Sequence, residues 1–360
     1  MDYNALFSQS ARVMQPSPIR RMAGLVNQPG VISFAGGMPN PSTFPEHDLK
    51  AILDDIVETD GYRIFQYGVT RGLEEFRDLL VQLLAERGVA SRREQLMITS
   101  GSQQGLELLS RVLLDPGDVV LVELPSYIGA LACFRNTLAE MVGVAQDEQG
   151  IIPEALAETT TRLRAEGRRI KFAYLIPNFQ NPSGITIAPD RRARVLEIAA
   201  EHGFLILEDD PYGELYFSDT PAEWLVPVKA RPGGEAVVYL SSFSKVVSPG
   251  LRTAFIAAPE AVIQQVELAK QAADLCTSSL DQRLIFEYCR RGLYAKHLEE
   301  VRGFYEAKCR AMLAAMDECM PAGVRWTRPK GGMFVWVTLP EGLDAEALAV
   351  EAVQQFKVAF

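Results

Sequence analysis

Short apolar runs alternate with amphipathic stretches through the middle of the chain. Between several of the runs, apolar residues recur at helical spacing, as in residues 104–114 and 189–203. Near-continuous apolar strands that alternate with helices predict an α/β fold with a mostly parallel sheet covered on both faces. The runs are LMIT (96–99), VVLVELP (119–125), KFAYLIP (171–177), FLILED (204–209), VVYLSS (237–242) and TAFIAA (253–258).

The C-terminal third has a different pattern. A long helical region at about 260–318 is followed by VRWTRP, GGMFVWVTLP, DAEALAVEAVQQF and KVAF. This order predicts a small α+β domain of strand, strand, helix and the start of another strand. A chain of 360 residues is too long for one ordinary core. We therefore expect an N-terminal arm and part of the small domain at 1–48, a large cofactor-binding domain at 49–285, and a small C-terminal domain at 286–360.

Composition narrows the class of protein. With 48% hydrophobic and 23% charged residues, the chain has the composition of an ordinary globular protein. The formal net charge of −10 argues against an extended nucleic-acid surface. No secretory signal and no apolar run of membrane-spanning length is present, so we expect a soluble cytoplasmic protein. The five cysteines show no metal spacing and are expected to be reduced core residues, and no metal site is expected.

Small and charged residues follow two of the predicted strands. SGSQQGLELL begins a helix, whose free N–H groups favour an anion, with Ser102 offering a hydroxyl and Gln103 a backbone amide. SSFSKVVSPGLR supplies Ser242 and Lys245, and Arg252 past its Pro-Gly turn could hold a phosphate with two hydrogen bonds. The alternatives are an ordinary serine N-cap and a loop with a solvated lysine and arginine.

The other strand ends offer groups for a flat, polar ligand. Tyr127 could stack on a ring, Asn181 could donate to a ring oxygen or a carboxylate, and Tyr212 could point into the same space. Asp209 ends a buried strand and should face a cation or a donor. Taken singly, these residues could equally be packing, an Asn-Pro turn and a helix-capping aspartate. Together, the five motifs fit pyridoxal 5′-phosphate, which has a phosphate, a flat ring, a ring oxygen, a basic nitrogen and an aldehyde for Lys245.

With these motifs in hand, the sequence resembles the class I/II aminotransferases of the fold type I pyridoxal-phosphate family. It is most similar to the branch of 2-aminoadipate and kynurenine aminotransferases, from about residue 17 to the end. The resemblance implies a large domain with a mostly parallel seven-stranded sheet, a small α+β domain, and a homodimer with shared active sites. The elements that carry it are SFAGGMPNPSTFP (33–45), YGVTRGLEEFRDLL (67–80), SGSQQGL, NPSG, EDDPY and SFSKVVSPGLR.

The resemblance also implies roles for the residues around the cofactor ring. Lys245 would form the Schiff base with the cofactor, and Asp209 would pair with its pyridinium nitrogen. Asn181 and Tyr212 would hydrogen-bond the ring oxygen, and Tyr127 would stack on the ring. Lys245, Asp209 and Tyr212 are thereby the expected catalytic residues.

Further roles concern the cofactor phosphate. Ser102, Gln103, Ser242 and Arg252 would hold it. In the family, a tyrosine that matches Tyr67 reaches the phosphate of the neighbouring subunit.

The last implied roles concern the substrate. Gly37 would make a backbone contact with it, Asn181 would bind it, and Arg20 would meet an acidic side chain, although Arg20 could equally be a surface arginine beside Arg21. The family holds the substrate carboxylate with an arginine from a later segment of the small domain. This sequence does not contain that segment. Either the small domain is C-terminally shortened, which is our expectation, or the carboxylate is held by other residues.

The expected function is that of an aminotransferase. The enzyme would move an α-amino group from an amino acid to a 2-oxo acid, such as 2-oxoglutarate, by a ping-pong mechanism. One alternative is another pyridoxal-phosphate reaction, either β-elimination or decarboxylation. Another is a non-catalytic sensor of the kind fused to DNA-binding modules, against which the acidic charge argues. No nucleic-acid or membrane partner is expected.

Overall fold

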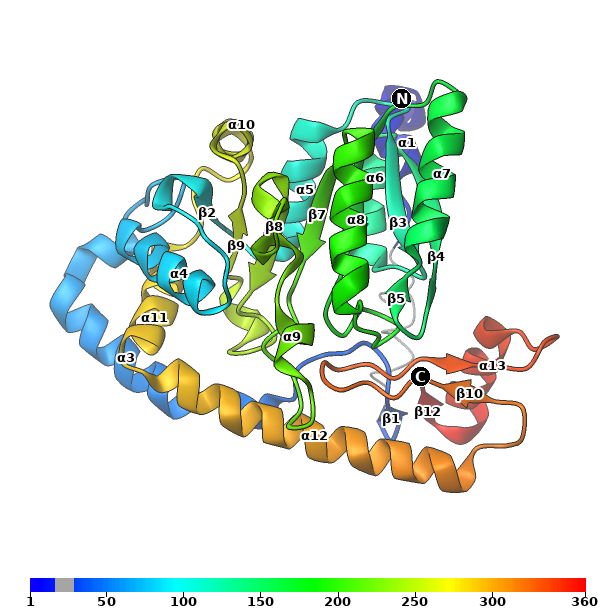
Figure 1. Ribbon diagram of the computed structural model, residues 1–360. Coiled ribbons are helices and arrows are strands. Elements are labelled where there is room, and N and C mark those ends of the chain that lie inside the picture. Colours follow the sequence, from blue (N-terminus) through cyan, green and yellow to red (C-terminus); the bar gives the residue numbers. More distant parts are fainter. Residues whose placement is uncertain (17–28) are drawn as a thin grey trace.

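The large domain is built around one mixed sheet (Figure 1). The computed structural model describes residues 1–16 and 29–360. Within these residues the sheet has eight strands, in the order β2-β9-β8-β7-β6-β3-β4-β5. The predicted seven-stranded α/β sheet is therefore confirmed, with the two-residue strand β5 added as a hairpin on β4. The strands are β2 Leu96–Thr99, β3 Val119–Leu124, β4 Glu140–Asp147, β5 Gly150–Ile151, β6 Ile170–Leu175, β7 Leu205–Asp209, β8 Val238–Ser242 and β9 Ala254–Ala257.

The direction of the strands determines which of their ends meet. β3, β4, β6, β7 and β8 pair in parallel, whereas β9 runs antiparallel to both of its neighbours, β2 and β8. The carboxyl ends of β2, β3, β6, β7 and β8 consequently lie at one edge of the sheet, together with the amino end of β9. We call this edge the carboxyl edge.

Helices cover both faces of the sheet because side chains alternate between the faces along each strand. In β3, Val120 and Val122 belong to one buried cluster, whereas Val119 and Leu121 belong to the other. The first cluster includes side chains from α5 Ser102–Leu113, α6 Ile128–Asn136 and α10 Glu260–Ala273. The second includes side chains from α7 Pro153–Ala165 and α8 Pro189–His202, which lie side by side in Figure 1.

The helical region predicted at 260–318 consists of three helices rather than one. α10 ends at Ala273, α11 spans Ser279–Arg290 and α12 spans Leu293–Cys319. Ser278 starts α11 by accepting a hydrogen bond from the N–H of Asp281. Gly292 separates α11 from α12 in the left-handed conformation, with φ at 73°, which side chains other than glycine rarely adopt. α3 Glu46–Asp60 and α4 Glu74–Glu86 pack against α11.

The small domain contains two short strand pairs. β1 Ile32–Ser33 runs parallel to β12 Val358–Ala359, and β10 Arg325–Trp326 runs antiparallel to β11 Val337–Thr338. The first pair joins residues 32–33 to residues 358–359. The division into an N-terminal part at 1–48 and domains at 49–285 and 286–360 stays a prediction. α12 runs from the large domain towards this region (Figure 1). A helix, α13 Ala345–Glu351, and a π-helical turn at Ala352–Phe356 complete it.

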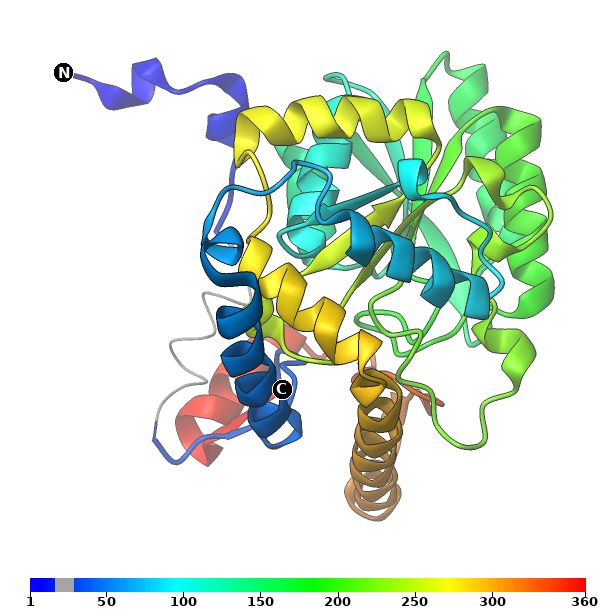
Figure 2. The same cartoon turned by 90° about the vertical axis from the view of Figure 1, so that its left-hand side faces the viewer.

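The N-terminal arm consists of a 3-10 turn at Tyr3–Leu6 and the short helix α1 Gln9–Val13. Figure 2 shows its first residues extending away from the body of the molecule, whereas α1 contacts α6, where the Ser10 hydroxyl donates to the carbonyl of Asn136. The remaining short elements are η2 Pro41–Thr43, η3 Gly61–Phe65, η4 Arg93–Gln95, α9 Ala222–Leu225, η5 Val228–Ala230, η6 Gly234–Ala236 and η7 Pro249–Leu251.

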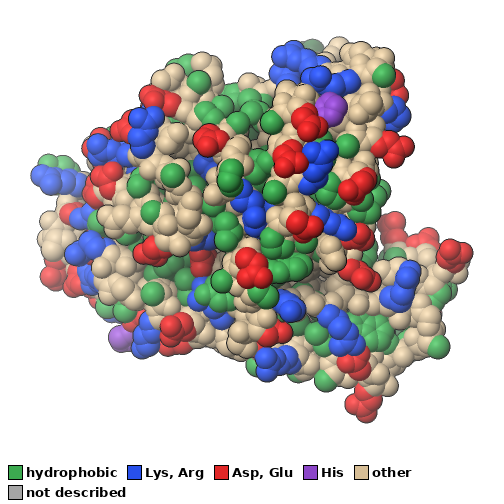
Figure 3. All heavy atoms as spheres, in the orientation of Figure 1, with side chains coloured by type: hydrophobic (Ala, Val, Ile, Leu, Met, Phe, Trp, Pro, Cys, Tyr) green, Lys and Arg blue, Asp and Glu red, His purple; other side chains and the backbone are tan. Residues whose placement is uncertain are grey.

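The surface carries charges of both signs. On the face in Figure 3, acidic and basic side chains are interspersed among apolar ones. None of the helices in the described residues is long and apolar enough to cross a membrane. All five cysteines are free thiols. Cys133 is buried but Cys319 is exposed, so the prediction of core positions is wrong for Cys319, which is the last residue of α12.

Candidate active site

The predicted site residues from the strand ends gather at the carboxyl edge. Tyr127 precedes α6, Asp209 is the last residue of β7, and Lys245 follows β8 by three residues. Arg252 precedes β9, and it reaches the same edge because β9 runs antiparallel to its neighbours. The structure thus brings together side chains that are far apart in the sequence.

The amine of Lys245 forms no ion pair with a carboxylate in the described residues. Its Nζ donates a hydrogen bond of 3.3 Å to the carbonyl of Gly37 and lies 6.0 Å from the ring centre of Tyr212. Burial lowers the pKa of Lys245, and the nearby charge of Arg252 lowers it further. Both effects favour the neutral amine, which is the form that acts as a nucleophile and a base.

Asp209 is held by one oxygen and has the other free. The hydroxyl of Tyr174 donates to Oδ2 at 2.7 Å, whereas Oδ1 is buried without a hydrogen-bond partner among the described residues. Burial raises the pKa of Asp209 to about 7; the hydrogen bond from Tyr174 opposes the rise, and the charge of Asp210 adds to it. A buried oxygen of this kind is normally paired, so Oδ1 indicates a place for a donor or a cation.

The carboxylates on either side of Asp209 have both oxygens occupied. Glu208 accepts hydrogen bonds from two backbone N–H groups. Asp210 forms a buried ion pair with Arg87 at 2.8 Å. It also accepts hydrogen bonds from Asn178 and Tyr239. Within the run EDD, only Asp209 therefore has an oxygen available for a ligand.

An aromatic group lies beside Asn181. The amide of Asn181 donates to the hydroxyl of Tyr212 at 3.3 Å, and burial raises the pKa of that phenol. The ring of Tyr212 packs edge-on against Phe334, with 5.8 Å between ring centres. Phe334 also limits position 37, because a Cβ on Gly37 would lie 2.3 Å from its ring. Sequence reasoning missed Phe334, for which the signal is the pair of glycines before it in GGMF.

Tyr127 and Gln103 support each other. The hydroxyl of Tyr127 donates to Gln103 Oε1 at 3.3 Å, and Gln103 Nε2 donates to the carbonyl of Gly129 at 2.9 Å. A Cβ at Gly129 would lie 2.4 Å from the Tyr127 ring, so glycine makes room for the aromatic side chain. The side chain of Gln103 is thereby engaged with α6, which leaves its backbone N–H at the start of α5 as the predicted donor.

Arg252 and two serines form a cradle suited to an anion. Arg252 has a left-handed backbone, with φ at 45°, and its guanidinium lies so close to Gly101 that a Cβ there would be 2.2 Å from it. The hydroxyls of Ser102 and Ser244 are buried without partners among the described residues. Ser242 Oγ accepts the N–H of Ser244 at 3.0 Å and donates to the Thr253 carbonyl at 3.4 Å. Ser244 was not among the predicted residues.

Two predicted residues are not part of this group. The side chain of Tyr67 is 79% exposed and makes no hydrogen bond to another residue that the structure describes. Arg20 lies outside the described residues.

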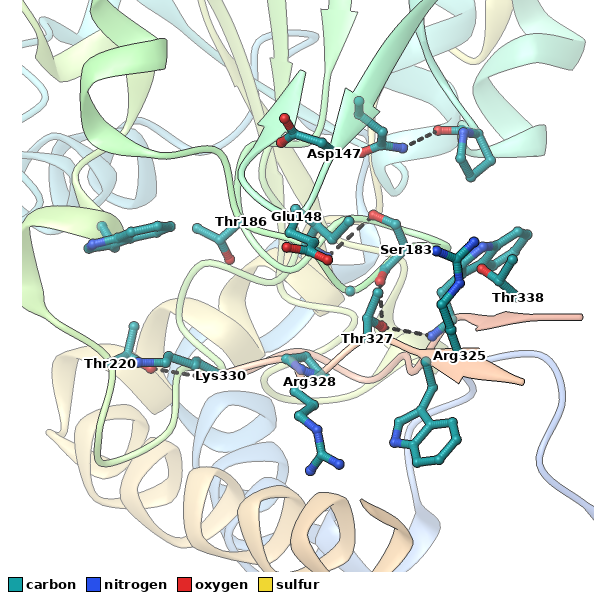
Figure 4. Close-up of a pocket in the computed structure, with 18 of the residues that line it drawn as sticks. Asp147, Glu148, Ser183, Thr186, Thr220, Arg325, Thr327, Arg328, Lys330 and Thr338 are labelled. Carbon is teal, nitrogen blue, oxygen red and sulfur yellow. Dashed lines mark hydrogen bonds between the residues drawn. The ribbon is translucent and has the colours of Figure 1, made fainter. Parts of the chain in front are cut away.

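A separate cavity of about 940 Å³ lies beside the 183–186 loop (Figure 4). It is bounded by the turn between β4 and β5 on one side and by residues 325–330 on the other. The hydroxyl of Thr327 ties residues 325–330 to the 183–186 loop by donating to the carbonyl of Ser183 at 2.9 Å. Figure 4 shows Arg328 turned away from the cavity, and this residue pairs with Asp317. None of the predicted site residues in the described parts of the chain lines this cavity.

Comparison with known proteins gives extensive matches. The family model "Aminotransferase class I and II" matches residues 35–360. The chain is 42% identical to aromatic-amino-acid aminotransferase 1 of Thermococcus litoralis, over 98% of this chain and 84% of that protein. It is 41% identical to the 2-aminoadipate transaminase of Thermus thermophilus, over 100% and 88% of the two chains. The crystal structure of a Thermus thermophilus alpha-aminoadipate aminotransferase complexed with N-(5′-phosphopyridoxyl)-L-leucine has a TM-score of 0.89 and 40% identity, over 100% and 88%.

Proposed function

This chain belongs to the class I and II aminotransferase family, and from this premise we propose that it moves an α-amino group from an amino acid to a 2-oxo acid in a ping-pong reaction. The chain is an aminotransferase, and its cofactor is pyridoxal 5′-phosphate. The observation that carries the proposal is that three buried oxygens at the carboxyl edge have no hydrogen-bond partner among the described residues, namely Ser102 Oγ, Asp209 Oδ1 and Ser244 Oγ.

These oxygens fit the chemistry of the cofactor. An anion at the start of α5 would give the hydroxyl of Ser102 an acceptor and would lie within reach of the Arg252 guanidinium. A protonated ring nitrogen at Asp209 Oδ1 would satisfy the buried carboxylate. We propose that the phosphate is held by Ser102, the N–H of Gln103, Ser242 and Arg252. Ser244, whose buried hydroxyl has no partner among the described residues, would be a further donor to it.

The ring would be held from its face and from its edge. Tyr127 would stack on it, and Asn181 and Tyr212, which are already hydrogen-bonded to each other, would contact the ring oxygen. When bound, pyridoxal 5′-phosphate supplies an electron sink for the negative charge that develops on the substrate's α-carbon. Asp209 would keep the ring nitrogen protonated and so strengthen that sink.

Lys245 would both attach the cofactor and move protons. Its lowered pKa favours the neutral amine, which would hold the cofactor through its aldehyde carbon, with the aldehyde oxygen leaving as water. With a substrate bound, the Lys245 amine would be the base that takes the proton from the substrate's α-carbon, and its protonated form would be the acid that returns a proton. The carbonyl of Gly37, 3.3 Å from Nζ, would orient the lysine and contact the substrate.

We propose a homodimer with shared active sites. The segment Gly61–Phe65 and the following residues expose three aromatic side chains, namely Tyr62 at 78%, Phe65 at 68% and Tyr67 at 79%. Exposed apolar residues close together favour a protein interface. In such a dimer Tyr67 would reach the phosphate in the partner's site.

The similarity to aminotransferases of aromatic amino acids and of 2-aminoadipate suggests donors of these two kinds. Phe334 and Tyr212 offer an aromatic surface beside Lys245. Arg20 would serve an acidic side chain. We propose 2-oxoglutarate as the amino acceptor.

The test is product analysis with the purified protein, saturated with pyridoxal 5′-phosphate. Each of phenylalanine, 2-aminoadipate and glutamate is incubated with a 2-oxo acid, using 2-oxoglutarate for the first two and phenylpyruvate for glutamate. The expected result is equal amounts of the donor's 2-oxo acid and the acceptor's amino acid, with no turnover by Lys245→Ala. Release of ammonia or carbon dioxide in place of amino transfer would instead identify a lyase or a decarboxylase.

A further inference from the structure

Tyr174 lies in the strand next to Asp209 and faces the same side of the sheet. β6 and β7 are parallel, with Tyr174 opposite Leu207, and both residues belong to the same buried cluster. Asp209 follows Leu207 by two positions and therefore points to the same face. The two side chains meet there, because the phenol donates to Asp209 Oδ2 at 2.7 Å.

The ring of Tyr174 is fixed by its surroundings. It is fully buried, and its edge contact with Phe134 places the two ring centres 5.4 Å apart, with 71° between the ring planes. Burial and the neighbouring charge of Asp209 raise the pKa of the phenol well above its usual value, so the hydroxyl remains a donor. A fixed donor on Oδ2 limits rotation of the carboxylate and leaves Oδ1 as its only open oxygen.

We propose that Tyr174 is a positioning residue for amino transfer: its hydroxyl anchors Oδ2 of Asp209, so that the carboxylate stays ionised and presents Oδ1 to the ring nitrogen of the cofactor. This inference rests on the proposed function, because the ring nitrogen at Oδ1 is part of that proposal. It adds a residue that does not touch the cofactor and acts through Asp209.

The physical reason is the competition for one proton between the ring nitrogen and Asp209. A hydrogen bond from Tyr174 stabilises the ionised carboxylate, and a buried carboxylate with few donors is costly. Without the hydroxyl, the proton moves towards Asp209, and the ring loses the positive charge that draws electrons from the substrate. The loss of a hydrogen bond to a charged group changes an equilibrium constant or a rate constant by about 10- to 100-fold.

The chain offers a matched control one strand away. Tyr239 in β8 is also fully buried, and its hydroxyl donates to Oδ2 of Asp210 at 3.0 Å. The same hydroxyl also accepts a hydrogen bond from Arg87 at 2.7 Å. Tyr239→Phe therefore removes a buried hydroxyl from the adjacent carboxylate, together with one more hydrogen bond than Tyr174→Phe removes. Asp210 keeps its partners Arg87 and Asn178, and it has no unpaired oxygen in the described structure. Any loss that comes only from deleting a buried hydroxyl should appear in both variants.

The experiment loads wild-type, Tyr174→Phe and Tyr239→Phe protein with pyridoxal 5′-phosphate labelled with ¹⁵N in the ring. The ¹⁵N chemical shift at one fixed pH reports protonation of the ring nitrogen, and stopped-flow absorbance reports the reaction with the amino donor. We expect a protonated ring in wild type and Tyr239→Phe. In Tyr174→Phe we expect a shift towards the unprotonated ring and a donor reaction about 10- to 100-fold slower.

Other outcomes separate this inference from the function on which it rests. A Tyr174→Phe protein with the wild-type ¹⁵N shift, or one that binds no cofactor while Tyr239→Phe does, would overturn the positioning role. An equal change in both variants would also overturn it, because that result belongs to general destabilisation. Wild-type protein that binds the labelled cofactor but reacts with no donor would overturn the proposed function.

Discussion

Two adjacent buried carboxylates at the end of β7 show how strongly the immediate partners of a side chain control its pKa. Asp210 is neighbour to Asp209, yet its ion pair with Arg87 leads the effects that oppose burial and keep its pKa low. Among the residues that the structure describes, Asp209 has no such cation, and burial raises its pKa to about 7. Asp210 is therefore fully paired within the described protein, whereas Asp209 has an oxygen free for a ligand.

Glu123 gives a pH-dependent prediction at the residue scale. Its Oε2 accepts the N–H of Ile176 at 2.8 Å, but burial raises the pKa of the carboxyl to about 8. The folded protein thus binds this proton more tightly than the unfolded chain, so the stability from Glu123 is present at low pH and is lost as pH rises to about 8. The free energy of unfolding should fall by at most about 1.4 kcal/mol per pH unit from this group.

Urea unfolding between about pH 5 and pH 9, at saturating cofactor, checks this dependence. The difference between wild type and Glu123→Gln should shrink or reverse as pH rises to about 8 and then stay constant. Glu148→Gln, which changes an exposed carboxylate, serves as the control and should follow wild type. A wild-type-minus-Glu123→Gln difference that does not vary with pH would contradict the assignment.

At the scale of elements, Gly292 separates two helices that the sequence pattern merges. Its φ of 73° is strained for any other residue, although a Cβ there would meet no atom within 4 Å. Gly292→Ala should lower the free energy of unfolding by about 1–2 kcal/mol through backbone strain alone. Gly303→Ala is the matched control, because Gly303 lies within α12 with equally open space. It should raise the free energy of unfolding by about 0.5–1 kcal/mol.

Chemical denaturation of the two glycine variants distinguishes these effects. Opposite signs are expected, with cofactor affinity unchanged in both. No change in Gly292→Ala would mean that the break between α11 and α12 does not depend on the glycine backbone. Destabilisation by Gly303→Ala would contradict the helix-propensity argument for the control.

Much of the site follows from strand ends that are visible in the sequence. Asp209 ends one apolar run and Lys245 follows another by three residues, and a parallel sheet brings such positions together. Arg252 is less obvious, because it reaches the edge only through the antiparallel direction of β9. The spacing of apolar residues does not predict the direction of a strand relative to its neighbours.

Other contacts could not be predicted because they join distant segments without a motif. In the sequence Tyr174 is one more apolar residue of a buried strand, and its hydrogen bond to Asp209 depends on the register between β6 and β7. Phe334 reaches Tyr212 from more than a hundred residues away. The helix breaks around 274–278 and at Gly292 interrupt a region whose apolar spacing remains helical throughout.

At the scale of the whole molecule, the proposed shared site can be tested with mixed dimers. Lys245→Ala and Tyr67→Ala chains, carrying different purification tags, are co-expressed and the mixed dimer is isolated. If Tyr67 serves the partner's site, one site of the mixed dimer has both changes and the other has neither. The mixed dimer should then show about half the wild-type activity and contain one site with wild-type cofactor affinity.

The result differs if Tyr67 serves its own chain's site. In that case each site of the mixed dimer has one change, so the site that retains Lys245 would have the weakened cofactor affinity of the Tyr67→Ala homodimer. The homodimers of both variants provide the reference values. A monomeric wild-type protein would contradict the shared site before any mixing.

The central claim is that Lys245 and its surroundings carry out amino transfer with pyridoxal 5′-phosphate. The most direct test is the visible absorption spectrum of the purified protein, recorded before and after addition of glutamate, 2-aminoadipate or an aromatic amino acid. We expect a visible band from the lysine-bound cofactor, absent in Lys245→Ala, that fades with a suitable donor and returns with a 2-oxo acid. A protein that shows no such band with added cofactor, or a band that none of these donors changes, would contradict the account.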